Sequence, residues 1–280
     1  MGQVTAAPDA GRNEEMNDTS VAGFKTRRWP VLVVLVAVLA IPLADGSAFG
    51  STTSVPATTS TVPATTSTLA PTCPKNLASQ VNVPAGTTQL ITVEVPSEHA
   101  TAATLTAWVR SGACWTLALG PYRAIVGYAG IRDHKHEGDD ATPAGTFAFG
   151  SVIYGNAANP GVKYGYHRLV CGDWWDEVSS SRDYNLFEHV ACGADPPFNN
   201  GDSEALWTET RSYPSFAVIN YNAARTPGRG SAIFLHAYDG KPTHGCVATP
   251  IGDLDRVLDW MRPHDSPRIG IGTSRMLKMR

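Results

Sequence analysis

The sequence predicts a mainly β domain that follows an N-terminal region of different composition. From Gln89 onward, short runs rich in β-branched and aromatic residues alternate with turns rich in Gly, Pro, Asn and Asp, a pattern typical of strands. A helical pattern stands out in one segment near the C-terminus. The first 72 of the 280 residues show neither pattern, and the remaining 280 − 72 = 208 residues are enough for one sizeable core or two small ones.

Composition excludes several classes of protein. The chain has 22 basic and 25 acidic residues and a net charge of −3, without a basic stripe, so we expect no nucleic-acid partner. Its 42% hydrophobic residues are too many for a chain that is disordered throughout. Because one apolar run alone approaches membrane length, a multi-spanning membrane protein is also excluded.

The N-terminal region reads as an export signal. Three basic residues between positions 25 and 28 precede the 14-residue apolar run Val31–Ala44, which is shorter than the ~20 residues of a comfortable membrane span. We assign 1–28 to a cytoplasmic segment and 29–48 to a signal peptide or a membrane anchor. Cleavage near Ala44 or Ala48 and retention as an anchor both fit the sequence, and a buried core helix is a weaker alternative.

A spacer follows at 49–72. It contains the unit Val-Pro-Ala-Thr-Thr-Ser-Thr twice, beginning at Val55 and at Val62. Recurring Pro with Thr and Ser favours an extended, semi-rigid linker that buries no core. We expect it to hold the folded part, residues 73–280, away from a membrane or within a cell-wall layer.

The folded part contains eight candidate strands and one candidate helix. The strands are 89–95, 104–110, 115–119, 124–128, 145–149, 216–220, 231–236 and 268–271. The helix spans 251–262, where apolar residues recur on one face, with Thr249 as its expected N-cap and Pro250 at its first helical position. The stretch 157–215 has weak periodicity, and we interpret it as long loops with short strands, a lid or a substrate-facing insertion.

Five cysteines in an exported chain leave one thiol over. Cys73 and Cys114 are natural partners across the first hairpin, and Cys171 and Cys192 lie on either side of a turn-rich loop. This pairing leaves Cys246 free. Five reduced, buried cysteines are the alternative.

The residues with catalytic potential lie close together near the C-terminus. His236 ends a candidate strand, and a short loop returns the chain to Thr243, His244, Gly245 and Cys246. A thiol with a pKa of about 8.5 is a competent nucleophile at neutral pH only beside an imidazole or another source of positive potential. The amides around Gly245 and Cys246 are candidates for stabilising an oxyanion.

Two other interpretations of these residues stay open. A histidine next to a cysteine also occurs as a packed core pair. His236, His244 and Cys246 are also possible zinc ligands, but no fourth ligand lies at a typical spacing, so we expect no metal.

The segment Ser-Ala-Ile-Phe-Leu-His236 through Thr243-His-Gly-Cys246 resembles the signature of the L,D-transpeptidases with a YkuD-type catalytic domain. A second landmark is similar as well: the acidic stretch from Glu137 that runs into Thr142-Pro143-Ala-Gly145-Thr-Phe. The likeness covers roughly 86–272 and is greatest to exported, actinobacterial-looking members.

The resemblance implies a β-sandwich catalytic domain with one C-terminal helix and long loops. It also implies that the protein is a cysteine acyltransferase that cross-links peptidoglycan stem peptides in the cell wall and needs no cofactor. The catalytic residues implied are Cys246 as nucleophile, His236 as general base and His244 as a second imidazole, with Thr243 and Gly245 shaping the loop and Thr142, Pro143 and Gly145 binding substrate.

Two departures from the family pattern concern substrate anchoring. The loop between His236 and Thr243 has six residues, and Ala248 stands where many members carry Asn or Arg. Two rival functions are a sortase-like transpeptidase, for which Arg256 would supply the arginine, and a non-catalytic wall-binding module. Against the sortase, Gly245 precedes the cysteine where sortases usually have Thr.

Overall fold

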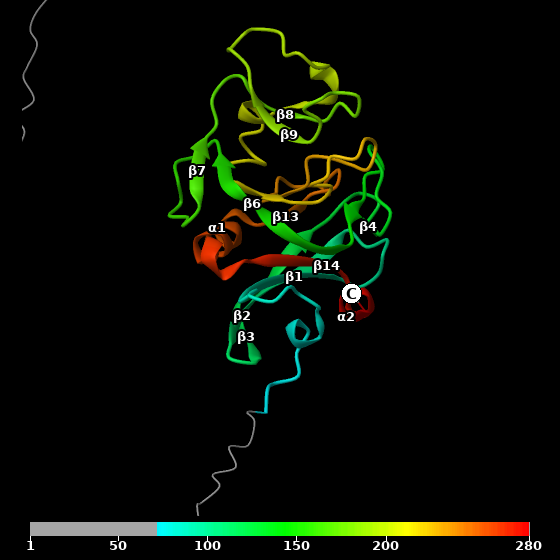
Figure 1. Cartoon of the computed structure of the whole chain (residues 1–280), viewed down its shortest axis with the longest axis vertical. Helices are drawn as coiled ribbons and strands as arrows, with labels where there is room; N and C mark the ends of the chain where they lie inside the picture. The colour runs from blue at the N-terminus through cyan, green and yellow to red at the C-terminus, as the bar shows by residue number, and fades with distance from the viewer. Residues whose placement is uncertain (1–71, 280) are drawn as a thin grey trace, which may run out of the picture. The chain divides into compact units, whose positions relative to one another are not determined.

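The computed structural model describes residues 72–279, so the expected cytoplasmic segment, the signal or anchor at 29–48 and nearly all of the linker lie outside the described residues. Within 72–279, no helix combines the length and the apolar character that crossing a membrane requires. The prediction of a mainly β fold is confirmed (Figure 1).

One large sheet forms the body of the domain. Its nine strands follow the order β11-β12-β13-β3-β2-β1-β14-β6-β7. They are β1 (Gln89–Val95), β2 (Ala102–Ser111), β3 (Cys114–Ile125), β6 (Gly145–Gly155), β7 (Gly165–Arg168), β11 (Phe216–Ile219), β12 (Phe234–Ala237), β13 (Val247–Thr249) and β14 (Arg268–Thr273). Because β11 pairs with β6 as well as with β12, the sheet closes on itself and encloses the main core.

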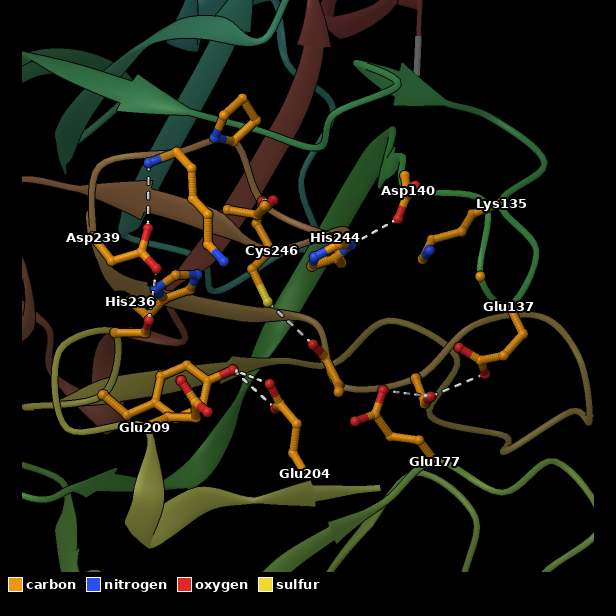
Figure 2. A pocket seen from close by; sticks show the side chains of 18 residues that line it. Lys135, Glu137, Asp140, Glu177, Glu204, Glu209, His236, Asp239, His244 and Cys246 are labelled. Atoms are coloured by element: carbon orange, nitrogen blue, oxygen red, sulfur yellow. Dashed lines mark hydrogen bonds and ion pairs between the residues drawn. The ribbon is translucent and has the colours of Figure 1, made fainter. Parts of the chain in front are cut away.

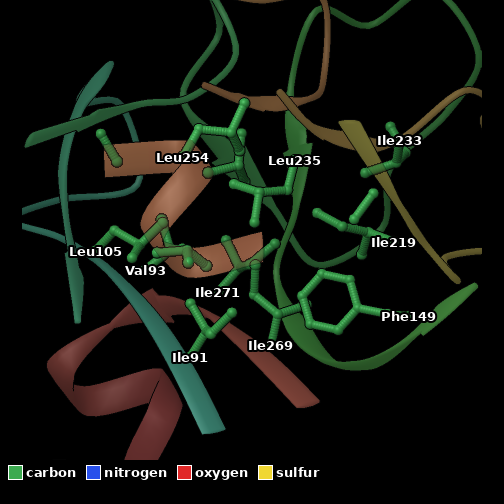
Figure 3. Packing of buried hydrophobic residues seen from close by; sticks show 14 of the residues in the cluster. Ile91, Val93, Leu105, Phe149, Ile219, Ile233, Leu235, Leu254, Ile269 and Ile271 are labelled. Carbon is green, nitrogen blue, oxygen red and sulfur yellow. The ribbon is translucent and has the colours of Figure 1, made fainter. Parts of the chain in front are cut away.

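Apolar side chains from both halves of the closed sheet fill that core. Ile91 and Val93 of β1 lie with Ile269 and Ile271 of β14, as Figure 3 shows, and they belong to one buried cluster. Strands β1 and β14 run parallel and both are buried almost throughout, which explains their continuous apolar sequences.

The helix α1 (Ile251–Trp260) covers this core with Leu254, which is fully buried. The helix starts at Ile251 as predicted, but the predicted N-cap was wrong by one position, since Pro250 is the N-cap and Thr249 is the last residue of β13. Thr249 is unavailable for capping because its hydroxyl donates to the carbonyl oxygen of Arg123 at 2.8 Å. The helix ends at Trp260, two residues before the predicted end.

A second helix, α2 (Ser274–Met279), was not predicted. Six residues are too few to display a 3.6-residue periodicity, so the sequence carries little signal for it. Leu277 anchors it in a small cluster with Leu90 and Trp115. Short 3-10 helices occur at Ala78–Gln80, Asn200–Asp202, Leu206–Thr208 and Pro263–Asp265.

The predicted strands 115–119 and 124–128 are one strand, β3. The dipeptide Gly120-Pro121 reads as a turn, but here it lies inside the strand, where the pairing with β2 shifts register near Leu105. Gly120 has φ +90°, and a Cβ there would lie 2.8 Å from the carbonyl oxygen of Leu105. The bulge therefore keeps both halves in the sheet.

The stretch 157–215 forms loops and short strands, as the sequence predicted. A separate three-stranded sheet is built from β10 (Glu204–Ala205), β8 (Asp173–Asp176) and β9 (Leu186–His189), and a two-stranded one from β4 (Ile131–Arg132) and β5 (Thr142–Pro143). Figure 1 shows β8 and β9 beyond β6, at one end of the domain.

Both expected cysteine pairs are bonded. Cys73 is joined to Cys114 and Cys171 to Cys192, each with a Cα–Cα distance of 5.1 Å. The second disulfide ties the segment before β8 to the segment after β9. Cys246 is free and buried.

Candidate active site

The parallel pairing of β12 with β13 brings His236 and the Cys246 thiol into the same region. In this register Leu235 lies opposite Val247 and His236 lies opposite Ala248. Cys246 immediately precedes β13, and its sulfur accepts a hydrogen bond from the Phe234 amide at 3.3 Å. Because alternate residues of a strand share a face, His236 points to the same side as Phe234 and the sulfur.

The thiol is held by the backbone of the residues before β12. The Cys246 Sγ donates to the carbonyl oxygen of Ala232 at 3.1 Å. The side chains of His236, His244 and Cys246 meet in one cavity, as Figure 2 shows. In this arrangement the thiol proton points at a carbonyl oxygen, so a rotation of the S–H bond precedes any transfer to an imidazole.

His236 is buried and its orientation is fixed on two sides. Its Nδ1 lies 2.8 Å from the carbonyl oxygen of Ala237, which makes Nδ1 the donor and leaves the lone pair on Nε2. The ring of Tyr213 meets the imidazole edge to face, with 5.4 Å between ring centroids. Burial lowers the pKa of His236 below its ordinary value, so the imidazole is neutral at neutral pH.

Two threonine hydroxyls fix the turn that carries Cys246. Thr142 and Thr243 both donate to the carbonyl oxygen of Cys246, at 2.9 and 2.7 Å. The Gly245 amide donates to the Thr243 hydroxyl at 3.2 Å. Gly245 has φ +151°, and a Cβ there would come 3.0 Å from the Ile233 side chain. The turn therefore requires glycine directly before Cys246.

The cavity around Cys246 has a volume of about 380 Å³ and a strongly acidic wall. Its charged lining consists of the carboxyl groups of Glu137, Asp140, Glu177, Glu204, Glu209 and Asp239 and the amines of Lys135 and Lys241, besides the two histidines. Most of the acidic residues lie on the side opposite the Thr243–Cys246 turn (Figure 2).

Glu204 and Tyr213 form a part of this wall that lies beside His236 and Cys246. The Tyr213 hydroxyl donates to both carboxyl oxygens of Glu204, at 2.7 and 2.8 Å. Burial raises the pKa of Glu204 to about 7, although the Tyr213 hydrogen bond acts in the opposite direction. Burial, together with the charge of Glu204, raises the pKa of the Cys246 thiol. The resting site therefore holds a neutral thiol beside a neutral imidazole.

Two further carboxyl groups of the wall, those of Glu137 and Glu177, lie near the hydroxyl of Ser231. Ser231 Oγ lies 2.9 Å from Glu137 and 3.5 Å from Glu177, and the Tyr184 hydroxyl donates to Glu137. Burial and the charges of Glu204 and Glu137 raise the pKa of Glu177 well above its ordinary value. This part of the wall keeps a carboxyl proton to higher pH than exposed glutamates do.

His244 lies at the mouth of the cavity, with its side chain 74% exposed. Its Nδ1 is 2.8 Å from Asp140 Oδ1, and its ring contacts Tyr128. It thus belongs to the cavity but differs sharply in burial from His236.

The three residues expected to bind substrate do not line the cavity. Thr142 and Pro143 are buried in β5, behind Cys246, and Gly145 packs against the ring of Phe147. Their neighbours Glu137 and Asp140 do line it. Substrate binding by Thr142, Pro143 and Gly145 stays a prediction, and the contact that the structure shows is support of the nucleophile's backbone by Thr142.

The other interpretations find little support in the geometry. Within the described part of the chain, no three His, Cys, Asp or Glu side chains are grouped so that they could hold a metal ion. Arg256, the arginine of the sortase-like alternative, is largely exposed on α1 and pairs with Asp253 at 3.0 Å.

Among the lining residues that sequence reasoning missed are Lys135, Glu177, Glu204 and Tyr213. Glu204 and Tyr213 lie in the weakly periodic stretch, where a single glutamate or tyrosine gives no signal. Lys135 belongs to the dense charged run just before Glu137, and that run was a signal available for it.

Comparison with known proteins agrees with the geometry. The family YkuD, described as the L,D-transpeptidase catalytic domain, matches residues 90–271, from β1 to β14. No curated protein and no solved structure matches the chain.

Proposed function

The chain belongs to the L,D-transpeptidase family, and from this premise we propose that it cross-links peptidoglycan stem peptides through a thioester on Cys246. The observation that carries the proposal is the presence of a buried free thiol and a buried, neutral imidazole in the lining of one cavity. The match to the family supports action on stem peptides in general.

The first step transfers an acyl group to the enzyme. The Cys246 sulfur attacks the carbonyl carbon of the diamino acid in a donor tetrapeptide, while its proton passes to Nε2 of His236. The C–N bond to the terminal D-alanine then breaks, and the imidazolium returns the proton to the leaving amine. The products are a thioester on Cys246 and free D-alanine, and the reaction needs no cofactor.

The second step transfers the acyl group from Cys246 to an acceptor amine, with the proton transfers in the reverse order. An amine of a neighbouring stem peptide attacks the thioester carbonyl, gives a proton to His236, and the thiol leaves as the proton returns to sulfur. The Ala237 carbonyl keeps the donor proton on Nδ1 in both steps, so Nε2 alone exchanges protons. Since Gly245 uses its amide on Thr243, the Cys246 amide is the backbone donor that we assign to the oxyanion.

An oxidising compartment outside the cytosol fits this role. Two disulfides are typical of an extracytoplasmic protein, and the family acts on the cell wall. We propose that residues 29–48 export the chain or anchor it to the membrane and that 49–72 space the domain from that point.

Intact mass measurement tests the acyl-enzyme. The wild-type domain, incubated with a purified muropeptide tetrapeptide or with a carbapenem as an activated acyl donor, should gain the mass of one acyl group on Cys246. Cys246→Ser should gain none, because a serine hydroxyl is far less acidic than a thiol and the site offers it no stronger base.

A control and a contrary outcome make the test decisive. Melting temperatures should show that Cys246→Ser is folded. A wild-type domain that stays unmodified, or a serine variant that still cross-links stem peptides, would rule out the proposed thioester.

A further inference from the structure

We propose that the Lys135 ammonium binds the carboxylate of the donor peptide's C-terminal residue, the residue that leaves during acylation. The inference rests on the proposed function and assigns a substrate group to a residue of the same cavity. Lys135 lines the cavity although its side chain is only 3% exposed.

The fold leaves room for this side chain beside the nucleophile. A Cβ on Gly245, the residue before Cys246, would lie 3.3 Å from Lys135 Cε. A Cβ on Gly230, which has φ +106°, would lie 2.8 Å from the same atom. Two glycines therefore border the path of the Lys135 side chain, and Figure 2 shows its amine on the cavity side near His244.

The ammonium is held in place without being neutralised. Lys135 Nζ lies 2.9 Å from Asp139 Oδ1 and 3.3 Å from the carbonyl oxygen of His136. The other Asp139 oxygen also faces Arg132, at 3.7 Å. The Asp139 carboxylate thus faces two cations, so the cluster of Lys135, Arg132 and Asp139 keeps a net positive charge.

Asp139 itself is fixed as a carboxylate. Burial alone would raise its pKa, but hydrogen bonds from the amides of His136 and Ala141 and from Lys135 outweigh burial and lower it. An ammonium has three N–H donors. Among the described residues, two acceptors are found for Lys135, which leaves the third donor for a ligand.

The rest of the cavity wall repels an incoming carboxylate. Six carboxyl groups line it, and the second lysine, Lys241, is exposed in the loop between β12 and β13. In the donor peptide, only the amide nitrogen and one α-carbon separate the scissile carbonyl from the terminal carboxylate. The carboxylate must therefore lie near Cys246 when the carbonyl lies over the sulfur, and Lys135 is a cation of the same cavity that packs against Gly245, the residue before Cys246.

The assignment also addresses the departure after the nucleophile. Many family members carry Asn or Arg two positions after the cysteine, whereas this chain has Ala248, which is buried in β13. Lys135 supplies a charged side chain from another part of the fold.

Acylation rates with two peptides test the proposal. The donor tetrapeptide is compared with the same peptide ending in a carboxamide, and intact mass follows thioester formation on the wild-type domain. We expect kcat/KM to be about 10- to 100-fold higher for the carboxylate, the range of one charge-assisted hydrogen bond. In Lys135→Met the carboxylate peptide should fall to the rate of the carboxamide, which should itself change little.

Three other lysine variants act as controls. Lys163→Met removes an exposed lysine that also pairs with an aspartate, Asp259 at 3.1 Å, outside the cavity, and it should leave both rates unchanged. Lys241→Met removes the other cavity lysine and should keep the preference for the carboxylate. Lys135→Arg keeps the positive charge and should retain the preference as well.

The outcomes separate this inference from the proposed function. If the wild-type domain is acylated by both peptides at equal rates, or Lys135→Met slows both equally, Lys135 does not bind the carboxylate although the thioester mechanism holds. Loss of the preference in Lys241→Met would assign the role to Lys241. If neither peptide acylates the wild type, the proposed function fails and the inference fails with it. Should Lys135→Met not fold, the wild-type comparison and Lys135→Arg still decide.

Discussion

At the residue scale, the surroundings of Cys246 favour the thiol over the thiolate. Many reactive cysteines are activated by a permanent positive potential, but here the sulfur lies in a buried cluster and faces Glu204. His236 is neutral for the same reason, its burial. In the proposed mechanism, proton transfer therefore accompanies attack, and the orientation of the imidazole matters more than its basicity.

Removing His236 should change the pH dependence of acylation. In the wild type the rate should fall as the pH drops through the lowered pKa of His236, because the protonated imidazole accepts no proton. His236→Ala should lower the rate by a factor on the order of 10² to 10⁴, and the activity that remains should increase toward alkaline pH. Acylation rates measured by mass from pH 5 to pH 10 check this.

The matched control is the second imidazole of the cavity. His244→Ala should have the smaller effect, since His244 is exposed and bound to Asp140. A larger loss in His244→Ala than in His236→Ala would reverse the two roles.

The Glu204 carboxylate should hold the thiol in its protonated form. In Glu204→Gln the negative charge is lost while an acceptor for Tyr213 remains, so the pKa of Cys246 should decrease. Alkylation by iodoacetamide, followed against pH, should reach half its maximum at lower pH in this variant. Glu209 lines the same cavity but meets Tyr213 through its backbone carbonyl, which accepts from the Tyr213 amide at 2.7 Å. Glu209→Gln should therefore shift the profile less, and an equal shift would mean that Glu204 has no special role.

At the element scale, the sequence predicts the strands that have an apolar pattern of their own. β1 is predicted to the residue because five of its seven residues are apolar or β-branched and turn-forming residues flank the run on both sides. The continuity of β3 was missed because Gly120-Pro121 is a turn signal whose bulge depends on the partner strand. The length of β12 was overestimated since Ala232, with φ +51°, leaves the extended conformation before Phe234.

The same limit applies to the site. The Thr-His-Gly-Cys motif and its upstream histidine are local in sequence, so they were found. Glu204 and Tyr213 reach the cavity only through pairing of β10 with β8 and through packing under β12, and neither contact is encoded in a local pattern. Residues that act through tertiary contacts need the fold before they can be recognised.

The disulfide Cys171–Cys192 should support the site as well as stability, because it closes the segment that carries β8 and β9. The double variant Cys171→Ser/Cys192→Ser should lose about 3 kcal/mol of unfolding free energy in urea, given the sequence separation of 21. It should also be acylated more slowly at a temperature where it is folded, since β10 depends on β8 for its position.

The other disulfide is the control. Cys73→Ser/Cys114→Ser opens a loop with a sequence separation of 41 and should lose a comparable free energy. Its acylation rate should not change, because Cys73 and Cys114 lie at the start of the domain and of β3. Slower acylation in this variant and not in the first would contradict the proposed support of the site by the insertion.

At the scale of the whole molecule, the cavity lowers stability. Glu177, Glu204 and Glu137 converge on a partly enclosed space, where carboxylates are unfavourable because they lose hydration and repel one another. A sequence selected for stability alone would replace them by apolar residues. Their presence beside Cys246 is consistent with the proposed action of this cavity on a polar peptide.

Stability should therefore depend on pH through Glu204 in a defined direction. Its pKa is raised from 4.5 to about 7 in the folded protein, so its favourable contribution is complete below pH 4.5 and is lost as the pH rises through 7. Glu204→Gln never ionises. Its melting temperature should equal that of the wild type near pH 4.5 and exceed it by several degrees at pH 8, which corresponds to a difference in the free energy of unfolding on the order of a few kcal/mol.

His236 acts in the opposite direction, since its lowered pKa removes stability as the pH falls below 6.5, but it is common to both proteins and cancels in the difference. Calorimetry of the two proteins from pH 4 to pH 8 measures that difference, and a gap that is constant with pH would show that Glu204 does not titrate in the folded domain.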